Sequence, residues 1–333
     1  MDKVRIALDA MGGDHAPGEV VKGALEAAGE DGMELLLVGA QEAITPCLAG
    51  RRNGLTIIPA SQVIDPRQPP VQAVQAQPDS SMMVGMRLVK EGKAQAFVSA
   101  GPTGALLASA LMVLGRLPGV DRPALGLLYN TPSGPTLFLD VGANPDCRPL
   151  FLLHFAQMGH EYMQRVWGVK GPRIGLLSNG EEEGKGNRLV REAYPLLQGS
   201  GLNFVGNVEG KDLFSGLAQV VVTDGFTGNV LLKGTEGFGE AIYRELGRTL
   251  RGRLLFRPLG LLLRPVLRDL KRKIDYNEYG AAPLLGVRGY VFAAHGRSRA
   301  RAIMNALLLA RRTVGQGQLE SLLREEECQN PSS

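Results

Sequence analysis

The sequence predicts an α/β fold in which a mostly parallel, mixed sheet is sandwiched by helices. The first observation is a unit that recurs five times: a short apolar strand, a polar glycine-rich turn and then a helix. Strands that alternate with helices predict βαβ units and a parallel sheet. The second observation is a hairpin predicted over residues 125–130 and 136–140 around the turn TPSGP, which adds antiparallel strands.

The five units lie in order along the chain. The first strand, 4–9, leads through MGGDHAP into a helix over 18–29. In the second unit, strand 96–100 leads through GPTG into helix 105–115, and in the third, strand 173–178 leads through NGEEEGKGN into helix 188–198. In the fourth, strand 219–224 leads through GFTGN into a helix from 230, and in the fifth, strand 290–294 leads through HGRS into helix 299–312. Right-handed crossovers place such turns at one edge of the sheet, where ligands bind. We therefore expect the five polar turns to converge on one cleft.

The remaining segments are predicted to be structural. Residues 35–39 and 55–59 are expected to form strands, 149–166 a helix, and 64–78 an exposed loop. The chain is predicted to hold one catalytic α/β unit over residues 1–315, and a division of this unit into two lobes stays open. The unit includes a helical basic and apolar extension over 236–280, and residues 316–333 are predicted to form a frayed C-terminal tail.

The composition excludes several classes of protein. A net charge of +4 over 333 residues is too small to indicate nucleic-acid binding, and no apolar run reaches the roughly 18 residues of a membrane span. Cys47, Cys147 and Cys328 are too few and too far apart for a disulfide framework or a zinc cluster. No signal peptide precedes the first strand, so we expect a cytoplasmic protein.

The first turn carries titratable groups that a plain connector does not need. Asp9, Asp14 and His15 lie within seven residues, beside the adjacent glycines Gly12 and Gly13. Glycine lets the backbone turn sharply and approach a ligand closely, and histidine titrates near neutral pH. The turn therefore predicts a site for a polar or anionic group.

The third turn, SNGEEEGKGN, is similar to a phosphate-binding P-loop but does not match it. Its spacing is GxxxGK, and no Ser or Thr follows the lysine. Backbone N–H groups and the dipole of the following helix favour a small anion beside Lys185. The alternative is a capped turn whose acids merely suit the helix dipole.

The other turns offer further polar groups. Asn229 either caps the next helix or donates its amide to a carbonyl oxygen, and His295 can bind an anion or move a proton. Two more histidines, His154 and His160, fall within a predicted helix and are interpreted as structural. No turn has the GxGxxG pattern, no GxSxG motif occurs, and no metal-ligand spacing is tight, so we expect no cofactor, metal or covalent nucleophile.

Residues 244–273 form a segment that is both basic and apolar. It holds ten Arg or Lys residues, two acids and many leucines. A membrane span would not hold five arginines, and the combination favours a helical hairpin at an anionic lipid surface. The alternatives are a dimer interface or a site for an acidic protein. The residues expected to make this contact are Arg251, Leu254, Leu255, Phe256, Arg257, Leu261, Leu262 and Arg264.

Nine segments between residues 4 and 311 carry a family resemblance. They are DAMGGDHAP, SAGPTGA, RPAL, LDVGANPDC, FAQMGHEYM, LLSNGEEEGKGN, NFVGNVEG, DGFTGNVLLKGTEG and YGAAPLLGVRGYVFAAHGRS. In this order they resemble the bacterial acyl-carrier-protein:phosphate acyltransferases, the PlsX family. Pro102 stands where that family usually has Asn, and it removes a backbone donor from its turn.

The resemblance implies a function and partners. The chain is expected to transfer a long-chain acyl group from acyl carrier protein to inorganic phosphate, which gives an acyl phosphate for phospholipid synthesis. The implied fold is similar to isocitrate dehydrogenase and phosphotransacetylase. The resemblance also implies a homodimer that associates reversibly with the inner face of the cell membrane and supplies a downstream membrane acyltransferase.

The expected mechanism is direct attack of phosphate on the thioester, without a covalent acyl-enzyme. We assign phosphate binding to Lys185, His15 and nearby N–H groups, and oxyanion stabilisation to Asn229 or Asn179, with Asp9, Asp14, Asp224 and Glu182 orienting His15 and Lys185. The catalytic set is His15, Asn179, Lys185, Asp224 and Asn229. The substrate- and phosphate-binding set is Asp9, Gly12, Gly13, Asp14, Ser99, Gly101, Thr103, Glu182, Gly186, Gly225 and His295.

Three other functions compete with this one. A short-chain phosphotransacylase that uses coenzyme A would not need the basic, leucine-rich segment. A metal- and nicotinamide-dependent decarboxylating dehydrogenase would need a cluster of metal-binding aspartates. A non-catalytic adaptor at a lipid surface would leave the five polar turns unexplained.

Overall fold

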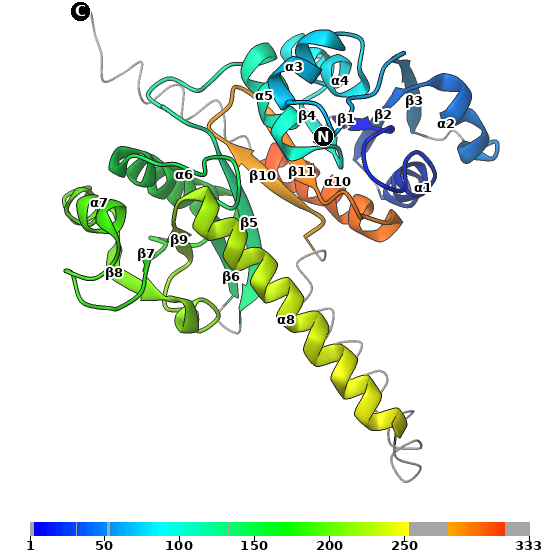
Figure 1. Ribbon diagram of the computed structural model, residues 1–333. Helices are drawn as coiled ribbons and strands as arrows, with labels where there is room; N and C mark the ends of the chain where they lie inside the picture. The colour runs from blue at the N-terminus through cyan, green and yellow to red at the C-terminus, as the bar shows by residue number, and fades with distance from the viewer. Residues whose placement is uncertain (1–2, 31, 52–53, 132–133, 253–278, 317–333) are drawn as a thin grey trace, which may run out of the picture.

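The computed structural model describes residues 3–30, 32–51, 54–131, 134–252 and 279–316. Within these residues, eleven strands form one sheet in the order β3-β2-β1-β4-β11-β10-β5-β6-β9-β7-β8. Helices cover both faces of this sheet (Figure 1). The predicted α/β class is therefore confirmed, and so is the mixed sheet.

The sheet has two parallel halves that run in opposite directions. The first half contains β1 (Val4–Asp9), β2 (Met33–Gly39), β3 (Leu55–Pro59), β4 (Ala96–Ser99) and β11 (Tyr290–Ala294). The second half contains β6 (Gly134–Leu139), β7 (Ile174–Ser178), β8 (Phe204–Glu209) and β9 (Val220–Val222). Between them lie β10 (Ala281–Leu285) and β5 (Ala124–Thr131).

Three antiparallel pairings, β11 with β10, β10 with β5 and β5 with β6, separate the halves. Three successive reversals leave the second half antiparallel to the first. The turns after β1, β4 and β11 therefore lie at one edge of the sheet, and the turns after β6, β7 and β9 lie at the opposite edge. The prediction that all five turns share one edge is wrong, because it assumed that the parallel direction continued through the predicted hairpin.

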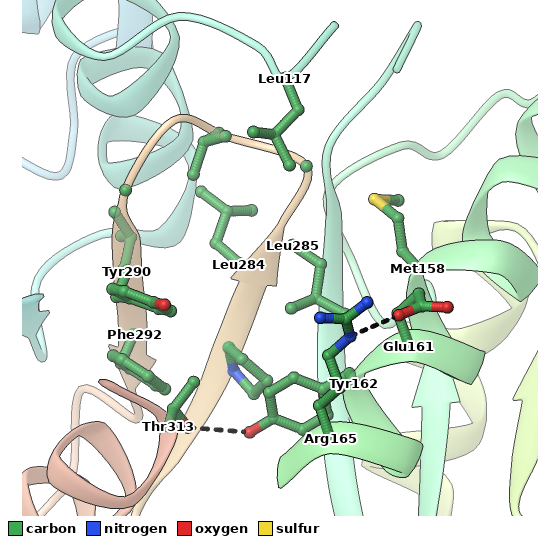
Figure 2. A pocket seen from close by; sticks show the side chains of 15 residues that line it. Leu117, Met158, Glu161, Tyr162, Arg165, Leu284, Leu285, Tyr290, Phe292 and Thr313 are labelled. Atoms are coloured by element: carbon green, nitrogen blue, oxygen red, sulfur yellow. Dashed lines mark hydrogen bonds and ion pairs between the residues drawn. The ribbon is translucent and has the colours of Figure 1, made fainter. Parts of the chain in front are cut away.

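Each face of the sheet has its own apolar core. The core of one face includes residues of α1 (Gly18–Ala27), α2 (Gln41–Leu48), α6 (Pro149–Trp167), α7 (Arg188–Gln198) and α10 (Ala300–Gly315). The other face has α3 (Pro70–Ala76), α4 (Ser81–Lys90), α5 (Thr103–Val113) and the first turns of α8 (Gly225–Gly252). Figure 2 shows β10 and β11 beside α6, where the halves meet.

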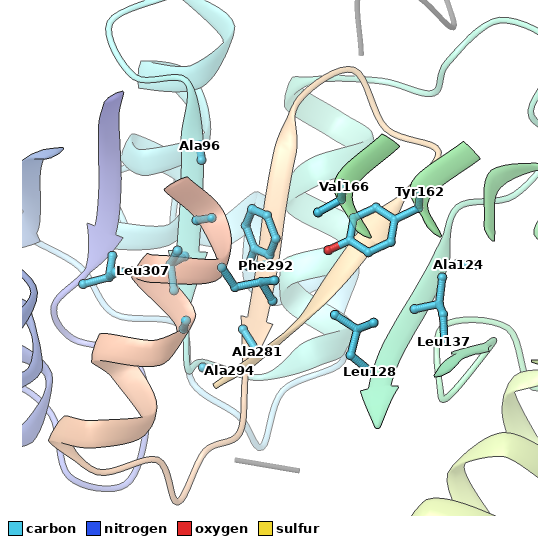
Figure 3. Close-up of a cluster of buried hydrophobic side chains, with 14 of the residues drawn as sticks. Ala96, Ala124, Leu128, Leu137, Tyr162, Val166, Ala281, Phe292, Ala294 and Leu307 are labelled. Atoms are coloured by element: carbon cyan, nitrogen blue, oxygen red, sulfur yellow. The ribbon is translucent and has the colours of Figure 1, made fainter. Parts of the chain in front are cut away.

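One core crosses from the first half to the second. Phe292 of β11 and Leu307 of α10 lie in the same cluster as Leu128, Leu137 and Tyr162 (Figure 3). These side chains are at most 3% exposed. Burying one Leu or Phe side chain stabilises a fold by about 1.5–3 kcal/mol. The cluster therefore holds the two halves together.

The predicted loop over 64–78 is partly wrong. Its residues Pro70–Ala76 form α3, with proline at a position in the first turn where no N–H is needed. Ala73 and Val74 are buried, and α3 packs against α5. The sequence did not predict this helix because the segment has few apolar residues. Its whole buried face consists of the small residues Ala73 and Val74.

Helix α8 extends away from the body of the protein (Figure 1). It begins at Gly225, five residues before the predicted start. Within the described part of the chain, no helix is long and apolar enough to span a membrane. The predicted extension 236–280 is described only as far as residue 252 and from 279 onwards, and of the predicted tail only Gln316 is described.

Candidate active site

At the first edge of the sheet, three turns that are distant in sequence are joined by hydrogen bonds. The hydroxyl of Ser99 donates to Asp9 Oδ2 at 2.7 Å, and the N–H of Gly101 donates to Ser99 Oγ at 3.0 Å. The N–H of Asp14 donates to the carbonyl oxygen of Gly296 at 2.8 Å. The turns after β1, β4 and β11 therefore form one polar group, as predicted for these three.

Gly12 allows the first turn to pack against its neighbours. A Cβ atom on Gly12 would lie 2.6 Å from Asp9 Oδ2 and 2.8 Å from the backbone nitrogen of Gly101. Gly13 has φ +101°, a conformation that disfavours other residues. The space that Gly12 leaves is thus occupied by protein atoms, and not by room for a ligand as the sequence suggested.

Asp9 is a buried carboxylate that makes hydrogen bonds within this group of turns. Its side chain is 2% exposed, and it accepts hydrogen bonds from Ser99 and from the N–H of Met11. Burial raises the pKa of the Asp9 carboxyl above its ordinary value. Both oxygens of Asp9 are engaged by these groups, and its expected role in orienting His15 stays a prediction.

The other predicted residues of this edge lie nearer the surface. His15 is half-buried, and its carbonyl oxygen accepts from the N–H of Glu19. His295 is exposed, and its Nδ1 accepts from the N–H of Arg297 at 3.1 Å. Thr103 is exposed at the first position of α5. These side chains remain accessible to an anion.

At the opposite edge, Asp140, which follows β6, is a heavily hydrogen-bonded carboxylate that was not among the predicted site residues. It is fully buried. Its Oδ1 accepts from the N–H groups of Leu125, Gly142 and Ala143, and its Oδ2 accepts from the N–H and the side-chain amide of Asn144, all at 2.6–3.1 Å. The signal was present, since Asp140 directly follows a buried strand and precedes a polar, glycine-containing turn.

The start of α8 packs directly on the Asp140 loop. The N–H of Gly225 donates to the carbonyl oxygen of Asn144 at 2.7 Å. A Cβ on Gly228 would overlap the carbonyl oxygen of Asp140. Asp224 caps the helix, because it accepts from the N–H and the hydroxyl of Thr227 at 2.8 and 2.7 Å. Asp224 and Gly225 therefore have structural partners, and the expected orienting role of Asp224 stays a prediction.

Asn229 lies in the second turn of α8, so it does not cap the helix. Its Nδ2 atom lies 3.4 Å from the position that a Cβ on Gly142 would occupy, which places the amide beside the Asp140 loop. Lys233 follows four residues later, is exposed, and shares this side of the helix. Lys233 was not among the predicted site residues, because the predicted fourth turn ends at residue 229.

Lys185 is exposed in the turn after β7, next to the start of α7. Its N–H donates to the carbonyl oxygen of Glu182, which also accepts from the side-chain amide of Asn207 at 2.8 Å. Asn187 caps α7 through the N–H of Val190, so the capped-turn interpretation is correct for Asn187. Gly186 has φ +99°. Asn179 and Glu182 are also exposed there.

An acidic cluster lies beside this turn. Carboxylate oxygens of Glu181, Glu209 and Asp212 lie within 4.8 Å of one another. The ammonium of Lys211 pairs with Glu209 and, at 3.2 Å, with Glu181. These carboxylates raise the pKa of Lys211, so a fixed cation already neutralises part of the cluster.

The predicted site residues thus fall into two groups, one at each edge of the sheet. Asn179, Lys185, Asp224 and Asn229 belong to the turns after β7 and β9, which are neighbouring strands. The turn of His15 follows β1 at the other edge. We expected His15 and Lys185 to share one phosphate because their turns were predicted at the same edge of the sheet. Their turns lie at opposite edges, so this reason no longer holds. Of the expected membrane or carrier contacts, Arg251 lies at the end of α8, and the other seven fall outside the described residues.

Comparison with known proteins agrees with this architecture. A family model described as fatty acid synthesis protein matches residues 4–321. A phosphate acyltransferase from Heliobacterium modesticaldum is 51% identical over 317 residues, which cover 94% of this chain and 95% of that protein. One from Dictyoglomus turgidum is 49% identical over 316 residues, with 93% and 94% covered.

A solved structure shows the same fold. The crystal structure of a phosphotransacetylase from Streptococcus pyogenes aligns with a TM-score of 0.63 and 20% identity, and the alignment covers 94% of each chain. This likeness shows that the two proteins share an overall fold. On the family match and the close relatives, the chain belongs to the fatty acid synthesis protein family, the family that its motifs resemble, and is an acyltransferase.

Proposed function

We propose that this chain transfers a long-chain fatty acyl group from acyl carrier protein to inorganic phosphate, as the name of its relatives suggests for the acceptor. The observation that carries the proposal is the edge formed by β6, β9 and β7. There the Asp140 loop, Asn229 and Lys185 follow three adjacent strands that run in the same direction. This edge offers amide, ammonium and N–H donors, which suit an anion and a developing oxyanion.

The reaction needs no covalent intermediate. A phosphate oxygen attacks the carbonyl carbon of the thioester, a C–O bond forms, and the C–S bond breaks. The electron pair leaves with sulfur, and the carrier thiolate takes a proton from solvent. Holding the two reactants together can supply roughly 7–11 kcal/mol, and one oxyanion donor about 3–4 kcal/mol.

In this proposal, each polar residue of the edge has a role. Lys185 and the N–H groups at the start of α7 hold the phosphate. The amide of Asn229 donates to the oxyanion, and Asn179 is the second candidate for that donor. Asp140 does not contact substrate; it positions the loop on which the start of α8 rests. His15, His295, Thr103 and the first-edge turns form a second polar surface for the carrier's polar groups.

The partners follow from charge and exposed apolar surface. Acyl carrier proteins are acidic, so the basic segment that begins near Arg251 suits either the carrier or an anionic lipid surface. The acyl phosphate product would pass to a membrane acyltransferase that makes phospholipid. We place the protein in the cytoplasm, reversibly at the inner face of the cell membrane.

We further propose a homodimer formed through α8. Phe238 and Ile242 are 68% and 52% exposed, one turn apart on this projecting helix. Leu246 continues the row at 36% exposure. Exposed apolar patches on a soluble protein favour a partner surface. A second α8 supplies an apolar row of the same kind.

The test is phosphate-dependent release of carrier thiol from palmitoyl acyl carrier protein. Lys185→Ala is expected to raise the KM for phosphate at least about tenfold, because a charged hydrogen bond is worth about 1.5–3 kcal/mol. Lys170→Ala is the matched control, since Lys170 is exposed before β7, at the other end of that strand. No thiol release by the unaltered protein with any acyl carrier would disprove the proposed function.

A further inference from the structure

The start of α8 has one side that packs on the Asp140 loop and another side that faces solvent. Gly225 and Gly228 form the packed side, where a Cβ atom on either residue would collide with backbone atoms of that loop. Phe226 and Val230 lie on the other side and are 65% and 57% exposed. They are four residues apart, so their side chains are neighbours on the helix surface. Two large apolar side chains are therefore exposed together where the helix begins.

Asn229 and Lys233 lie beside these two apolar side chains. At about 3.6 residues per turn, the four residues fall within about 100° of the helix circumference. The amide of Asn229 borders the Asp140 loop, because its Nδ2 atom lies 3.4 Å from the position of a Cβ on Gly142. Lys233 is exposed one turn further along. This face of α8 therefore combines an amide donor and a positive charge with exposed hydrocarbon.

The face is distinct from the apolar row that we assign to the dimer. Phe238 lies twelve residues after Phe226, and Ile242 lies twelve residues after Val230. Twelve residues turn an α-helix by about 120° beyond three whole turns. A second α8 that lies along Phe238 and Ile242 therefore meets a different side of the helix, and Phe226 and Val230 call for another partner.

The chemistry of the face matches an acyl group that is joined to an anion. A purely apolar partner would not use the ammonium of Lys233, and free phosphate would leave Phe226 and Val230 in water. An acyl phosphate has both parts, because its hydrocarbon chain and its phosphate meet at one carbonyl carbon. In the proposed function Asn229 holds the oxygen of that carbonyl. The first methylene groups then lie within about one helical turn, 5.4 Å, of the residues that flank Asn229.

We propose that Phe226 and Val230 bind the first methylene groups of the acyl chain and select substrates with a hydrocarbon chain next to the thioester. The proposal rests on the proposed function, because it takes Asn229 as the donor to the thioester oxygen. Phe226 and Val230 cover only the part of the chain near the carbonyl carbon. Their contribution to kcat/KM therefore rises over the first methylene groups and stays constant as the chain becomes longer.

The first test is the dependence of kcat/KM on chain length in Phe226→Ala. The substrates are acetyl, butanoyl, hexanoyl, octanoyl and palmitoyl acyl carrier protein, which share the same protein part. The variant is expected to lower kcat/KM less than about twofold for the acetyl substrate. It should lower kcat/KM at least about fivefold, and equally, for hexanoyl, octanoyl and palmitoyl, since one lost methylene contact corresponds to about fourfold.

Met112→Ala is the matched control for this series. Met112 is 48% exposed near the end of α5, in the other half of the sheet. Its substitution is expected to leave all five values of kcat/KM within about twofold of the parent. An equal loss for acetyl and hexanoyl in Phe226→Ala, a loss that keeps growing up to palmitoyl, or no loss would overturn the proposal.

A second measurement detects the contact without catalysis. Phe226→Trp places an indole at the proposed contact, and its fluorescence is expected to shift to shorter wavelength when carrier protein with an S-hexadecyl thioether is added. The parent protein, whose one tryptophan is Trp167, receives the same additions so that the signal of Trp167 can be subtracted. Carrier protein without an alkyl group and vesicles of phosphatidylglycerol are the controls.

The outcomes of the fluorescence measurement separate this proposal from the proposed function. A shift with the S-hexadecyl carrier, in a protein whose parent releases no thiol, would reject only the proposed function. An equal shift with the unalkylated carrier or with the vesicles would assign the face to a protein or a lipid surface and overturn the proposal. The absence of a shift would also overturn it, whatever the activity.

Discussion

The side-chain amide of Asn144 donates a 2.7 Å hydrogen bond to the carbonyl oxygen of Pro123. The same amide donates to Asp140 Oδ2 at 2.9 Å. Through these two bonds, the loop after β6 is joined to the segment that leads into β5. The Asp140 loop and the start of β5 are therefore held together, and a shift of the loop would disturb both.

Asp140→Ala is expected to lower the free energy of unfolding by at least about 3 kcal/mol, because several buried donors lose their acceptor together. Chemical denaturation followed by circular dichroism measures the change. Asp146→Ala, at an exposed position of the same loop, is expected to change stability by less than about 0.5 kcal/mol. Equal effects of the two substitutions would show that the hydrogen bonds of Asp140 contribute little.

Gly228→Ala is expected to cost about 1–3 kcal/mol of stability, because the new methyl group meets the carbonyl oxygen of Asp140. It should also lower kcat, since the clash displaces the start of α8 and with it Asn229. Gly234→Ala is the matched control in the same helix, where a Cβ meets nothing within 4 Å. That change is expected to stabilise the helix by up to about 1 kcal/mol. The reverse order of stabilities would contradict the packing of α8 on this loop.

The raised pKa of Asp9 predicts that its contribution to the free energy of unfolding falls as pH rises. Its folded-state pKa is raised by burial above the unfolded value, so the folded protein binds the proton more tightly. This contribution is complete below the unfolded pKa and is lost as pH rises through the folded pKa. Asp9→Asn removes the dependence, so the variant should gain stability relative to the parent as pH rises from about 4. Urea denaturation across this range measures the difference.

Asp79 is the control, because its contribution to stability changes with pH in the opposite direction. The hydrogen bond from the Ser61 hydroxyl lowers the pKa of the Asp79 carboxyl. Its contribution is present above the unfolded pKa and is lost as pH falls through the folded pKa. Asp79→Asn should therefore lose stability relative to the parent as pH rises. If Asp9→Asn and Asp79→Asn gave the same trend, the interpretation of Asp9 as a destabilised buried carboxylate would be incorrect.

Asn229→Ala is expected to lower kcat by about 10²–10³, the usual cost of removing one oxyanion donor. The KM for phosphate should change little, because the amide acts on the thioester oxygen. Steady-state kinetics with palmitoyl acyl carrier protein separates the two parameters. Asn203→Ala is a suitable control, since Asn203 is exposed and donates to the carbonyl oxygen of Gly171. A rise in the KM for phosphate alone would show that Asn229 binds phosphate and does not stabilise the oxyanion.

Phe238→Glu combined with Ile242→Glu is expected to convert a dimer into a monomer. Each substitution places a charge where the proposed interface removes apolar surface from water. Sedimentation equilibrium at several protein concentrations measures the change in mass. Leu196→Glu, at an exposed position of α7, should leave the mass unchanged. A parent protein that is already monomeric would reject the α8 interface.

Elements with strong periodicity could be predicted from the sequence. The strands of β1, β3 and β11 and the helix α7 have the predicted bounds, because apolar residues and polar turns limit them sharply. Helices α2 and α4 and strands β8 and β10 were not predicted. Pro46 lies inside α2 and Pro283 lies inside β10, so the usual rules for proline argued against both elements.

The candidate site was predicted in parts but not in arrangement. Local chemistry drew attention to the turns of Lys185 and Asn229, and their roles stay predictions. The direction of each strand depends on pairings between distant segments, such as Leu284 with Leu125, and one sequence carries no direct signal of these. The contact of Asp140 with Leu125 of β5 could not be predicted for a related reason, although its position after a buried strand was visible in the sequence.

The position of β11 has a consequence for biosynthesis. Residues Tyr290–Ala294 form a central strand between β4 and β10, and α10, which follows it, packs against α1. A nascent chain still lacking these residues leaves β4 with an open edge and the apolar side of α1 uncovered. The first half of the sheet is therefore completed only after residues 290–315 have left the ribosome, and until then its exposed surfaces are available to chaperones.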